Sequence, residues 1–220
     1  MRGMSLAKKR IKRIGFKLVF GQFLFKLFIV PVLRMIGLRR VRQIISHYQL
    51  DQTPIPSSKK VLIKSVNDDQ CIRLLTDIGP DLVIVNGTRV ISERVLKSVS
   101  ATFINLHTGM TPKYRGVHGG YWAMAMNDRA LCGVTVHLVD KGIDTGGVIY
   151  QNTIPVTLSD NFYTYPFIQF GVGIPLLVHA VDDVLHKRLQ TRKSVTDESY
   201  LWYHPTIWKY LQIYFTTGIM

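Results

Sequence analysis

The chain has 220 residues, two cysteines and a formal net charge of +14 at pH 7. This length predicts one domain with an appendage, able to bury about 70% of the unfolded surface without disulfide staples. Two cysteines outside any CxxC or Cys/His cluster exclude a disulfide framework and a zinc module, and they predict a reducing compartment.

The positive charge is concentrated at the N-terminus. Residues 1–42 hold twelve Lys and Arg and no acidic residue, whereas the other 178 residues hold sixteen bases and fourteen acids. Because this larger part has no surplus charge to follow phosphates, the pattern disfavours nucleic acid as a partner.

The N-terminal segment joins a basic run, Arg2 to Arg13, to apolar residues 16–38 and further arginines. Its length approaches that of a membrane span, but polar side chains interrupt it, Pro31 should bend it, and Lys26 would cost about 2.5–3.5 kcal/mol near the bilayer centre. A cleaved signal peptide fits less well, because no small-residue cleavage site follows.

Two interpretations of this segment remain open. It forms either a helix on the membrane surface, with phenylalanines in the acyl boundary, or a helix packed on the domain with snorkelling lysines. We expect a basic helical segment and linker over residues 1–58, with peripheral membrane contact through residues 1–42. Pro and Ser residues within 49–60 predict the linker.

Strand-like and helical patterns alternate along the remaining chain. Strands are predicted at 61–66, 81–86, 102–107, 133–139 and 148–156. Short helices are predicted from a cap at Asn67 to Gly79, over 92–99 and over 119–127. A long helix should begin at Asp160, reach about Arg188 and bend at Pro175.

This alternation predicts an α/β fold with an open, doubly wound, mostly parallel sheet over residues 59–190. The aromatic segment 191–220 should dock on the core. In such sheets the ligand crevice lies at the carboxyl ends of the strands. Polar groups follow three predicted strands, at Asn86, at Asn105–His107 and at Asp140–Asp144.

Asn105 and His107 alternate along one predicted strand, so their side chains share a face roughly 7 Å apart. The amide can donate to a developing oxyanion, and the imidazole can polarise a carbonyl or transfer a proton. A nearby aspartate, Asp144, would hold His107 charged or fix its tautomer. A lone histidine here would more simply be a hydrogen-bonded rim residue.

The loop from Asp140 to Gly147 is rich in glycine, which lets backbone amides approach a ligand closely. The alternating acids of a calcium loop are absent, so no metal is expected. His137 either supports the site or bonds to backbone. The sequence also lacks GxSxG, P-loop and GxGxxG motifs.

Other side chains in the loop after His107 have two interpretations each. Lys113 and Arg115 either hold an anionic substrate group or lie on the surface. Tyr121 either stacks on a substrate ring or packs in the core.

In their order along the chain, three motifs resemble the folate-dependent formyltransferase family, which includes glycinamide ribonucleotide, methionyl-tRNA and sugar N-formyltransferases. They are Asn105-Leu-His107, Pro112-Lys-Tyr-Arg-Gly116 and His137-Leu-Val-Asp-Lys-Gly-Ile-Asp144-Thr-Gly146. The resemblance covers about residues 60–190. Within the family, the chain is most similar to the sugar N-formyltransferases.

The resemblance implies transfer of a formyl group from N10-formyltetrahydrofolate, as co-substrate, to a primary amine. Asn105 and His107 would stabilise the tetrahedral oxyanion, and Asp144 would raise the pKa of His107 and move the proton, while His137 and Thr145 support them. The donor pocket would be built largely from backbone. Its residues would be Gly87, Arg89, Val90, Ile91, Val139, Asp140 and Gly142. The substrate-binding residues would be Lys113, Tyr114, Arg115 and Tyr121.

The chain departs from the family pattern in three places. Thr108-Gly109 replaces the usual Pro-Ser, and residues 119–122 lack a proline common in purine and tRNA enzymes, which disfavours those acceptors. The basic apolar segment stands where family members open with a βαβ unit. We therefore expect a cytoplasmic enzyme, at the inner face of the membrane and forming a homodimer, that formylates a small amine such as an amino sugar nucleotide. The alternative is an N-terminally shortened, non-catalytic protein that binds folate, a partner or a membrane surface.

Overall fold

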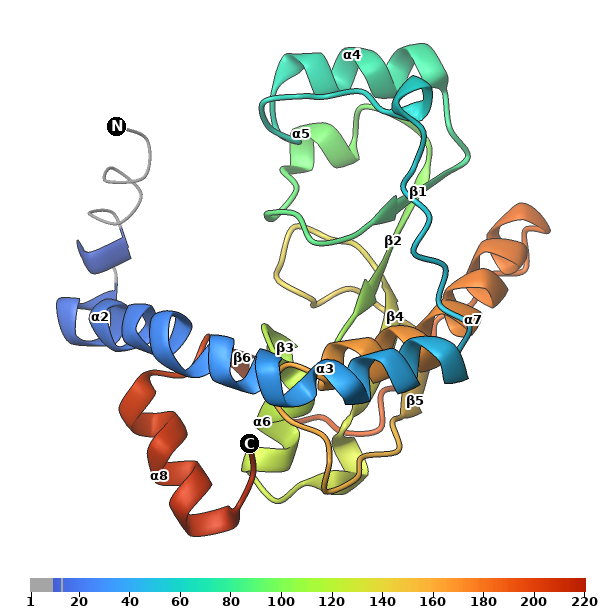
Figure 1. Cartoon of the computed structure of the whole chain (residues 1–220). Helices are drawn as coiled ribbons and strands as arrows, with labels where there is room; N and C mark the ends of the chain where they lie inside the picture. Colours follow the sequence, from blue (N-terminus) through green and yellow to red (C-terminus); the bar gives the residue numbers. More distant parts are fainter. Residues whose placement is uncertain (1–9, 13) are drawn as a thin grey trace.

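A four-stranded mixed sheet forms the centre of the molecule (Figure 1). The computed structural model describes residues 10–12 and 14–220; the rest of the N-terminal basic run lies outside the described residues. In spatial order the strands are β1 (Leu82–Val85), β2 (Thr102–His107), β4 (Gly133–Leu138) and β5 (Val148–Thr153).

The strand directions correct the expected topology. Strands β1 and β2 are parallel, but β2–β4 and β4–β5 are antiparallel, so the prediction of a mostly parallel, doubly wound sheet is wrong. Residues 108–132 stay at the end of the sheet where β2 stops, and residues 139–147 close a hairpin. Neither link crosses the sheet as a parallel connection must. The fold is mixed α/β with an open mixed sheet.

The two faces of the sheet have different roles. Ile104 and Leu106 of β2 pack with Val134 and Val136 of β4 on the face covered by α7 (Tyr165–Leu185). Alternate residues point to the other face, where α4 (Asp69–Ile78) and α5 (Glu93–Leu96) cover the β1 end. The polar residues of β2 and β4 lie on this second face.

The chain before β1 differs from its predicted structure. Residues 61–66 form no strand, because β1 pairs with β2 alone, and Leu62 is 91% exposed. Asp68, rather than Asn67, caps α4 by accepting from the backbone of Cys71. Gly79 ends α4 in the left-handed conformation, as its predicted stop requires. A 3₁₀ turn, η2 (Ser57–Lys59), lies within the predicted linker.

The N-terminal segment forms a nearly continuous helix made of α2 (Phe16–Leu24), a π-helical turn η1 (Phe25–Ile29) and α3 (Val30–His47). Pro31 stands in the first turn of α3, immediately after the π turn. The wider turn accommodates a residue that has no N–H to donate and whose ring would crowd the preceding carbonyl.

The long helix α7 begins later than predicted. Its N-cap is Thr164, Pro166 occupies the first turn, and the helix runs through Pro175. Asp160 is not its cap; it binds Arg40 of α3 instead.

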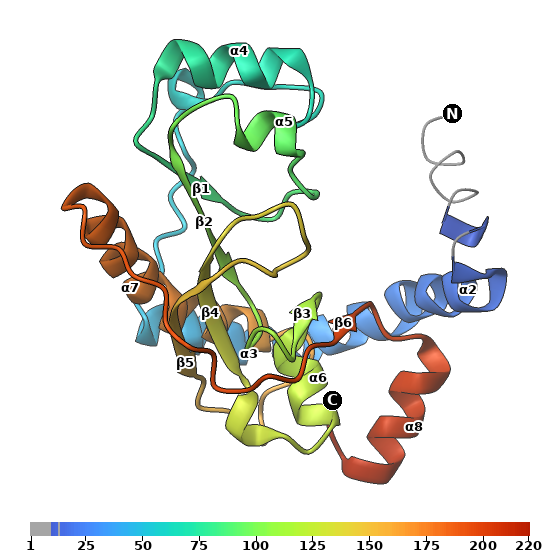
Figure 2. The same ribbon diagram turned by 180° about the vertical axis from the view of Figure 1, so that it is seen from behind.

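The remaining elements form the end of the molecule beside α2. They are α6 (Gly119–Ala125), the 3₁₀ turn η3 (Arg129–Leu131), the short parallel pair β3 (Arg115–Gly116) with β6 (Leu201–Trp202), and α8 (Ile207–Thr217). Seen from behind, the segment after α7 runs past β5 to reach β3 (Figure 2). Tyr210 and Ile213 of α8 are buried, so the aromatic C-terminus docks on the core as expected.

Candidate active site

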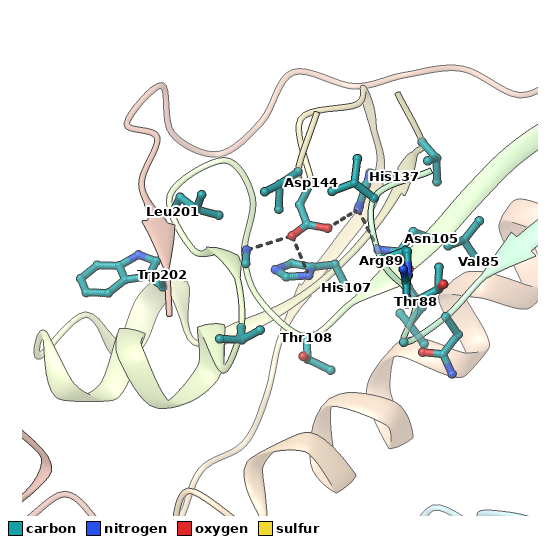
Figure 3. A pocket seen from close by; sticks show the side chains of 18 of the residues that line it. Val85, Thr88, Arg89, Asn105, His107, Thr108, His137, Asp144, Leu201 and Trp202 are labelled. Carbon is teal, nitrogen blue, oxygen red and sulfur yellow. Dashed lines mark hydrogen bonds and ion pairs between the residues drawn. The ribbon is translucent and has the colours of Figure 1, made fainter. Parts of the chain in front are cut away.

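A cavity of about 770 Å³ opens on the second face of the sheet. On one side its wall is the loop after β1, residues 86–91. Asn105, His107, His137 and Asp144 stand in the middle, and residues 201–204 form the other side (Figure 3). Because β4 is antiparallel to β2, the loop that carries Asp144 folds back across this face, so the cavity does not lie on one rim of strand ends.

Asp144 is the centre of the polar cluster. Its Oδ2 accepts a hydrogen bond from the backbone N–H of Gly116 at 2.8 Å and lies 3.5 Å from Nδ1 of His107. Its Oδ1 lies 3.6 Å from Nε2 of His137. Asp144 itself has φ of 51°, a left-handed conformation that aims its side chain back at the sheet.

Backbone carbonyls fix the tautomers of both histidines. Nε2 of His107 lies 2.8 Å from the carbonyl of Tyr114, and Nδ1 of His137 lies 2.7 Å from that of Leu138. A carbonyl only accepts, so these nitrogens carry protons. In the neutral rings the other nitrogens are acceptors: Nε2 of His137 accepts from the Asn105 amide at 3.1 Å, and Nδ1 of His107 faces Asp144.

The electrostatics favour a carboxylate beside a neutral imidazole. Burial would raise the pKa of Asp144, but the neighbouring imidazoles of His137 and His107 and the Gly116 N–H together hold that pKa below its ordinary value. Burial lowers the pKa of His107 below 6.5, and Asp144 opposes this only in part. Asp144 does act to raise the pKa of His107, as the motifs imply, but desolvation of the buried ring is the larger effect and leaves that pKa below its ordinary value.

The loop predicted to hold the donor does line the cavity. Gly87, Arg89, Val90 and Ile91 all belong to its wall, and Arg89 is the one Lys or Arg among the described residues that line it. Asn67 pins this loop, because its amide donates to the carbonyl of Val90 and its oxygen accepts from the backbone of Ser92.

The loop after β4 lines the cavity opposite the loop of residues 86–91. Val139, Asp140 and Gly142 line the cavity. The Asp140 carboxylate accepts from the backbone of Gly142 and from the hydroxyl of Thr145, so it holds its own loop closed. A Cβ at Gly142 would lie too close to Thr145 to be accommodated without a shift.

The predicted substrate-binding residues lie elsewhere. Lys113 pairs with Asp128 and Glu198 outside the cavity, and the hydroxyl of Tyr114 donates to Asp128. Arg115 donates to the carbonyl of Ile143 and to Ser199. Tyr121 is 1% exposed in the core. The structure brings none of these four side chains into the cavity; Tyr114 and Arg115 instead brace His107 and the Asp144 loop.

The far wall comes from residues that the motifs did not identify. Leu201, Trp202, Tyr203 and His204 lie on it together with His118. Nε2 of His118 and Nδ1 of His204 lie 2.9 Å apart. Burial lowers the pKa of His118 to about 3 and that of His204 to about 4, so both rings are neutral at pH 7. The run of aromatic residues around 200–204 was the available signal.

The structure leaves no room for a side chain at Gly109, one of the two residues of the Thr108-Gly109 departure. A Cβ on Gly109 would lie 2.3 Å from the carbonyl of Tyr114 and 2.7 Å from Nε2 of His107. Glycine therefore permits the hydrogen bond that fixes the His107 tautomer.

Among residues 10–12 and 14–220, no group of three or more His, Cys, Asp or Glu side chains is arranged to hold a metal ion.

Comparison with known proteins gives a family match. The sequence profile described as "Formyl transferase" matches residues 41–165, which include Asn105, His107, His137 and Asp144. The methionyl-tRNA formyltransferase of Thermodesulfovibrio yellowstonii is 30% identical over 153 residues, covering 65% of this chain and 49% of the relative. That of Koribacter versatilis is 36% identical over 119 residues, covering 54% and 38%.

Solved structures share the fold at lower identity. A sugar N-formyltransferase from Shewanella sp FDAARGOS_354 has a TM-score of 0.51 at 21% identity, covering 61% of this chain and 53% of that one. Glycinamide ribonucleotide transformylase 1 from Symbiobacterium toebii has a TM-score of 0.52 at 23% identity, covering 57% and 59%. The chain spans about half the length of the curated relatives it matches, or less.

Proposed function

The chain belongs to the formyl transferase family, and we propose that it moves a formyl group from N10-formyltetrahydrofolate to a primary amine of a small substrate. The observation that carries this proposal is Asp144. Its carboxylate stands at the middle of the cavity, between two histidines of fixed tautomer and beside the Asn105 amide.

The reaction needs one bond made, one broken and one proton moved. The amine nitrogen attacks the formyl carbon, the bond from that carbon to N10 breaks, the amine loses a proton and N10 gains one. Asp144 is ionised, so it can take the proton from the amine. Nδ1 of His107, which faces Oδ2 at 3.5 Å, can share that proton before it returns to the leaving nitrogen.

Asn105 supplies the oxyanion contact. One N–H of its amide is bound to His137, and a primary amide has a second N–H to donate. Preorganised donors of this kind stabilise a tetrahedral intermediate by acting where charge develops. Because both nitrogens of His107 face protein atoms, we assign His107 to proton sharing with Asp144 rather than to direct contact with the oxyanion.

The two halves of the cavity suit the two substrates. We assign the folate to the Gly87–Ile91 side, where backbone lines the wall and Arg89 can meet the anionic glutamate tail. The amine then enters from the Leu201–His204 side, where aromatic and neutral imidazole groups would stack on a planar or sugar ring. An amino sugar carried on a nucleotide fits this wall, and we place the reaction in the cytoplasm.

The test is a panel of amines incubated with the protein and N10-formyltetrahydrofolate, with formylated products identified by mass spectrometry. The panel includes amino sugar nucleotides and methionyl-tRNA, because relatives carry both activities in their names. We expect one amine to gain a formyl group with the wild type and not with Asp144→Asn. Donor binding without formylation of any amine would favour a non-catalytic, folate-binding protein instead.

A further inference from the structure

The N-terminal helix α2–η1–α3 presents two unlike faces, and one of them is fixed to the protein. A Cβ on Gly21 would lie 2.3 Å from the ring of Trp208, and one on Gly37 would lie 3.0 Å from Thr164, so the helix backbone approaches its neighbours closely. Gln22 donates to the carbonyl of His204 at 2.8 Å, and Arg40 pairs with Asp160 at 2.8 Å. These contacts extend along most of the helix.

The outer face of this helix is apolar and exposed to solvent. Ten large apolar side chains on it are each more than 40% exposed. They are Phe16, Leu18, Phe20, Phe23, Leu27, Phe28, Val32, Met35, Ile36 and Leu38. Apolar residues scattered singly on a surface need no explanation, but ten exposed on one helix call for a partner.

The exposed charged residues of this helix are cationic. Lys17, Lys26, Arg34, Arg39 and Arg42 are exposed, and residues 1–50 include no Asp or Glu. A helix that combines exposed phenylalanines and aliphatic residues with Lys and Arg matches a bilayer interface, where apolar groups enter the acyl boundary and cations meet anionic headgroups.

We propose that this outer face docks the protein on an anionic lipid surface, with the helix lying in the plane of the interface. The segment Phe16–His47 is long and apolar enough to cross a membrane, as is α7. Crossing would pull Gly21, Gln22, Gly37 and Arg40 away from their partners, whereas lying flat keeps every one of those contacts.

A second copy of this chain fits the outer face less well. A twofold interface would place the same cations opposite one another, with no carboxylate on the helix to pair them. RNA fits less well too, because the four phenylalanines of this face could stack on bases but its six other apolar side chains offer neither hydrogen bonds nor rings.

The experiment is vesicle flotation of the full chain, with vesicles of phosphatidylcholine alone and of phosphatidylcholine with phosphatidylglycerol. Phe23→Ser with Phe28→Ser removes two side chains that are 57% and 56% exposed. Leu158→Ser with Val178→Ser is the matched control, because these apolar residues are at least as exposed and lie outside the N-terminal helix. Circular dichroism and thermal unfolding establish that each variant is folded.

We expect the wild type to float with the anionic vesicles and not with the neutral ones. The Phe variant should lose about tenfold or more of this binding, and the control should keep it. Absence of flotation by the folded wild type, or equal flotation of the Phe variant, overturns the proposal. If the wild type shows no vesicle binding, a solution dimer or tRNA binding that is lost in the Phe variant assigns the face to that partner and overturns the proposal as well. None of these outcomes depends on formyl transfer.

Discussion

Asp144 and Asp160 are both carboxylates with little exposure, and they serve different ends. The Asp160 side chain is fully buried and accepts from Arg40, from the backbone and hydroxyl of Thr157, and from Thr164. Asp144 is 15% exposed, accepts one backbone hydrogen bond and faces two imidazoles across 3.5–3.6 Å. The number of close donors separates a carboxylate that holds the scaffold together from one that remains able to exchange a proton.

The largest expected effect is on catalysis at Asp144. Asp144→Asn keeps the shape of the side chain but removes the base, so turnover with the amine found in the panel should fall about 10²–10⁴-fold. The free energy of unfolding should change by about 1 kcal/mol or less, since the carboxylate is partly solvated. Steady-state rates and urea unfolding measure the two quantities, and unchanged turnover contradicts the mechanism.

Removal of the oxyanion donor should have a somewhat smaller effect. Asn105→Ala is expected to lower kcat about 10²–10³-fold. Asn161, a buried amide that donates to the carbonyl of Leu33, is the matched control. Asn161→Ala should lower stability and leave kcat of the folded enzyme intact. A loss in kcat for Asn161→Ala equal to that of Asn105→Ala would show that the assay responds to folding rather than to chemistry.

Asp160 should respond in the opposite way from Asp144. Asp160→Ala leaves Arg40 and Thr157 without their acceptor, which should lower the free energy of unfolding by about 2–4 kcal/mol, less than for a fully buried pair because Arg40 is 25% exposed. Turnover per folded molecule should not change. Urea unfolding of Asp160→Ala, Arg40→Ala and the double variant isolates the pair, and additive effects would mean that the two groups do not interact.

The smallest expected effect is on the pH dependence of stability, to which Asp160 and the pair His118 and His204 contribute in different pH ranges. The lowered pKa of Asp160 means that its contribution to stability is complete above about pH 4 and is lost as pH falls through the folded value. His118 and His204, with folded pKa values of about 3 and about 4, bind fewer protons than they do unfolded, so stability falls as pH drops below about 6.5.

Urea unfolding between pH 7 and pH 4.5 should therefore show a decline in wild type. The decline should be smaller in His118→Asn and undiminished in Asp160→Asn. Asparagine suits position 118 because it tolerates the positive φ of 59°. A decline that disappears in Asp160→Asn would assign it to the carboxylate instead.

The sequence predicted the four sheet strands because apolar residues dominate each of them, but it did not predict their directions. Apolar runs report burial, and nothing in them reports whether the following loop crosses the sheet. The predicted strand at 61–66 has a strand-like pattern without a pairing partner. At the start of α4, Asn67 and Asp68 are both good N-cap residues. The sequence alone therefore does not determine which of the two begins the helix, and the loop geometry decides it.

The candidate site was predictable to the extent that it lies in short motifs. Asn105, His107, His137 and Asp144 come together as the motifs imply, and their catalytic roles remain predictions. The wall at 201–204 was not predictable, because nearly sixty residues separate it from Asp144 and the pairing of β6 with β3 brings it there. The pKa of His107 depends on burial, which no motif reports.

The most direct test of a formyl-transfer centre at Asp144 is calorimetric titration with 5-formyltetrahydrofolate, a stable relative of the donor. We expect micromolar binding by the wild type, equal binding by Asp160→Asn at a pH and temperature where that variant is folded, and weaker binding by Arg89→Ala. Absence of binding by folded wild-type protein would contradict the assignment of the folate donor to this cavity. The interpretation of the chain as a non-catalytic protein would then be favoured.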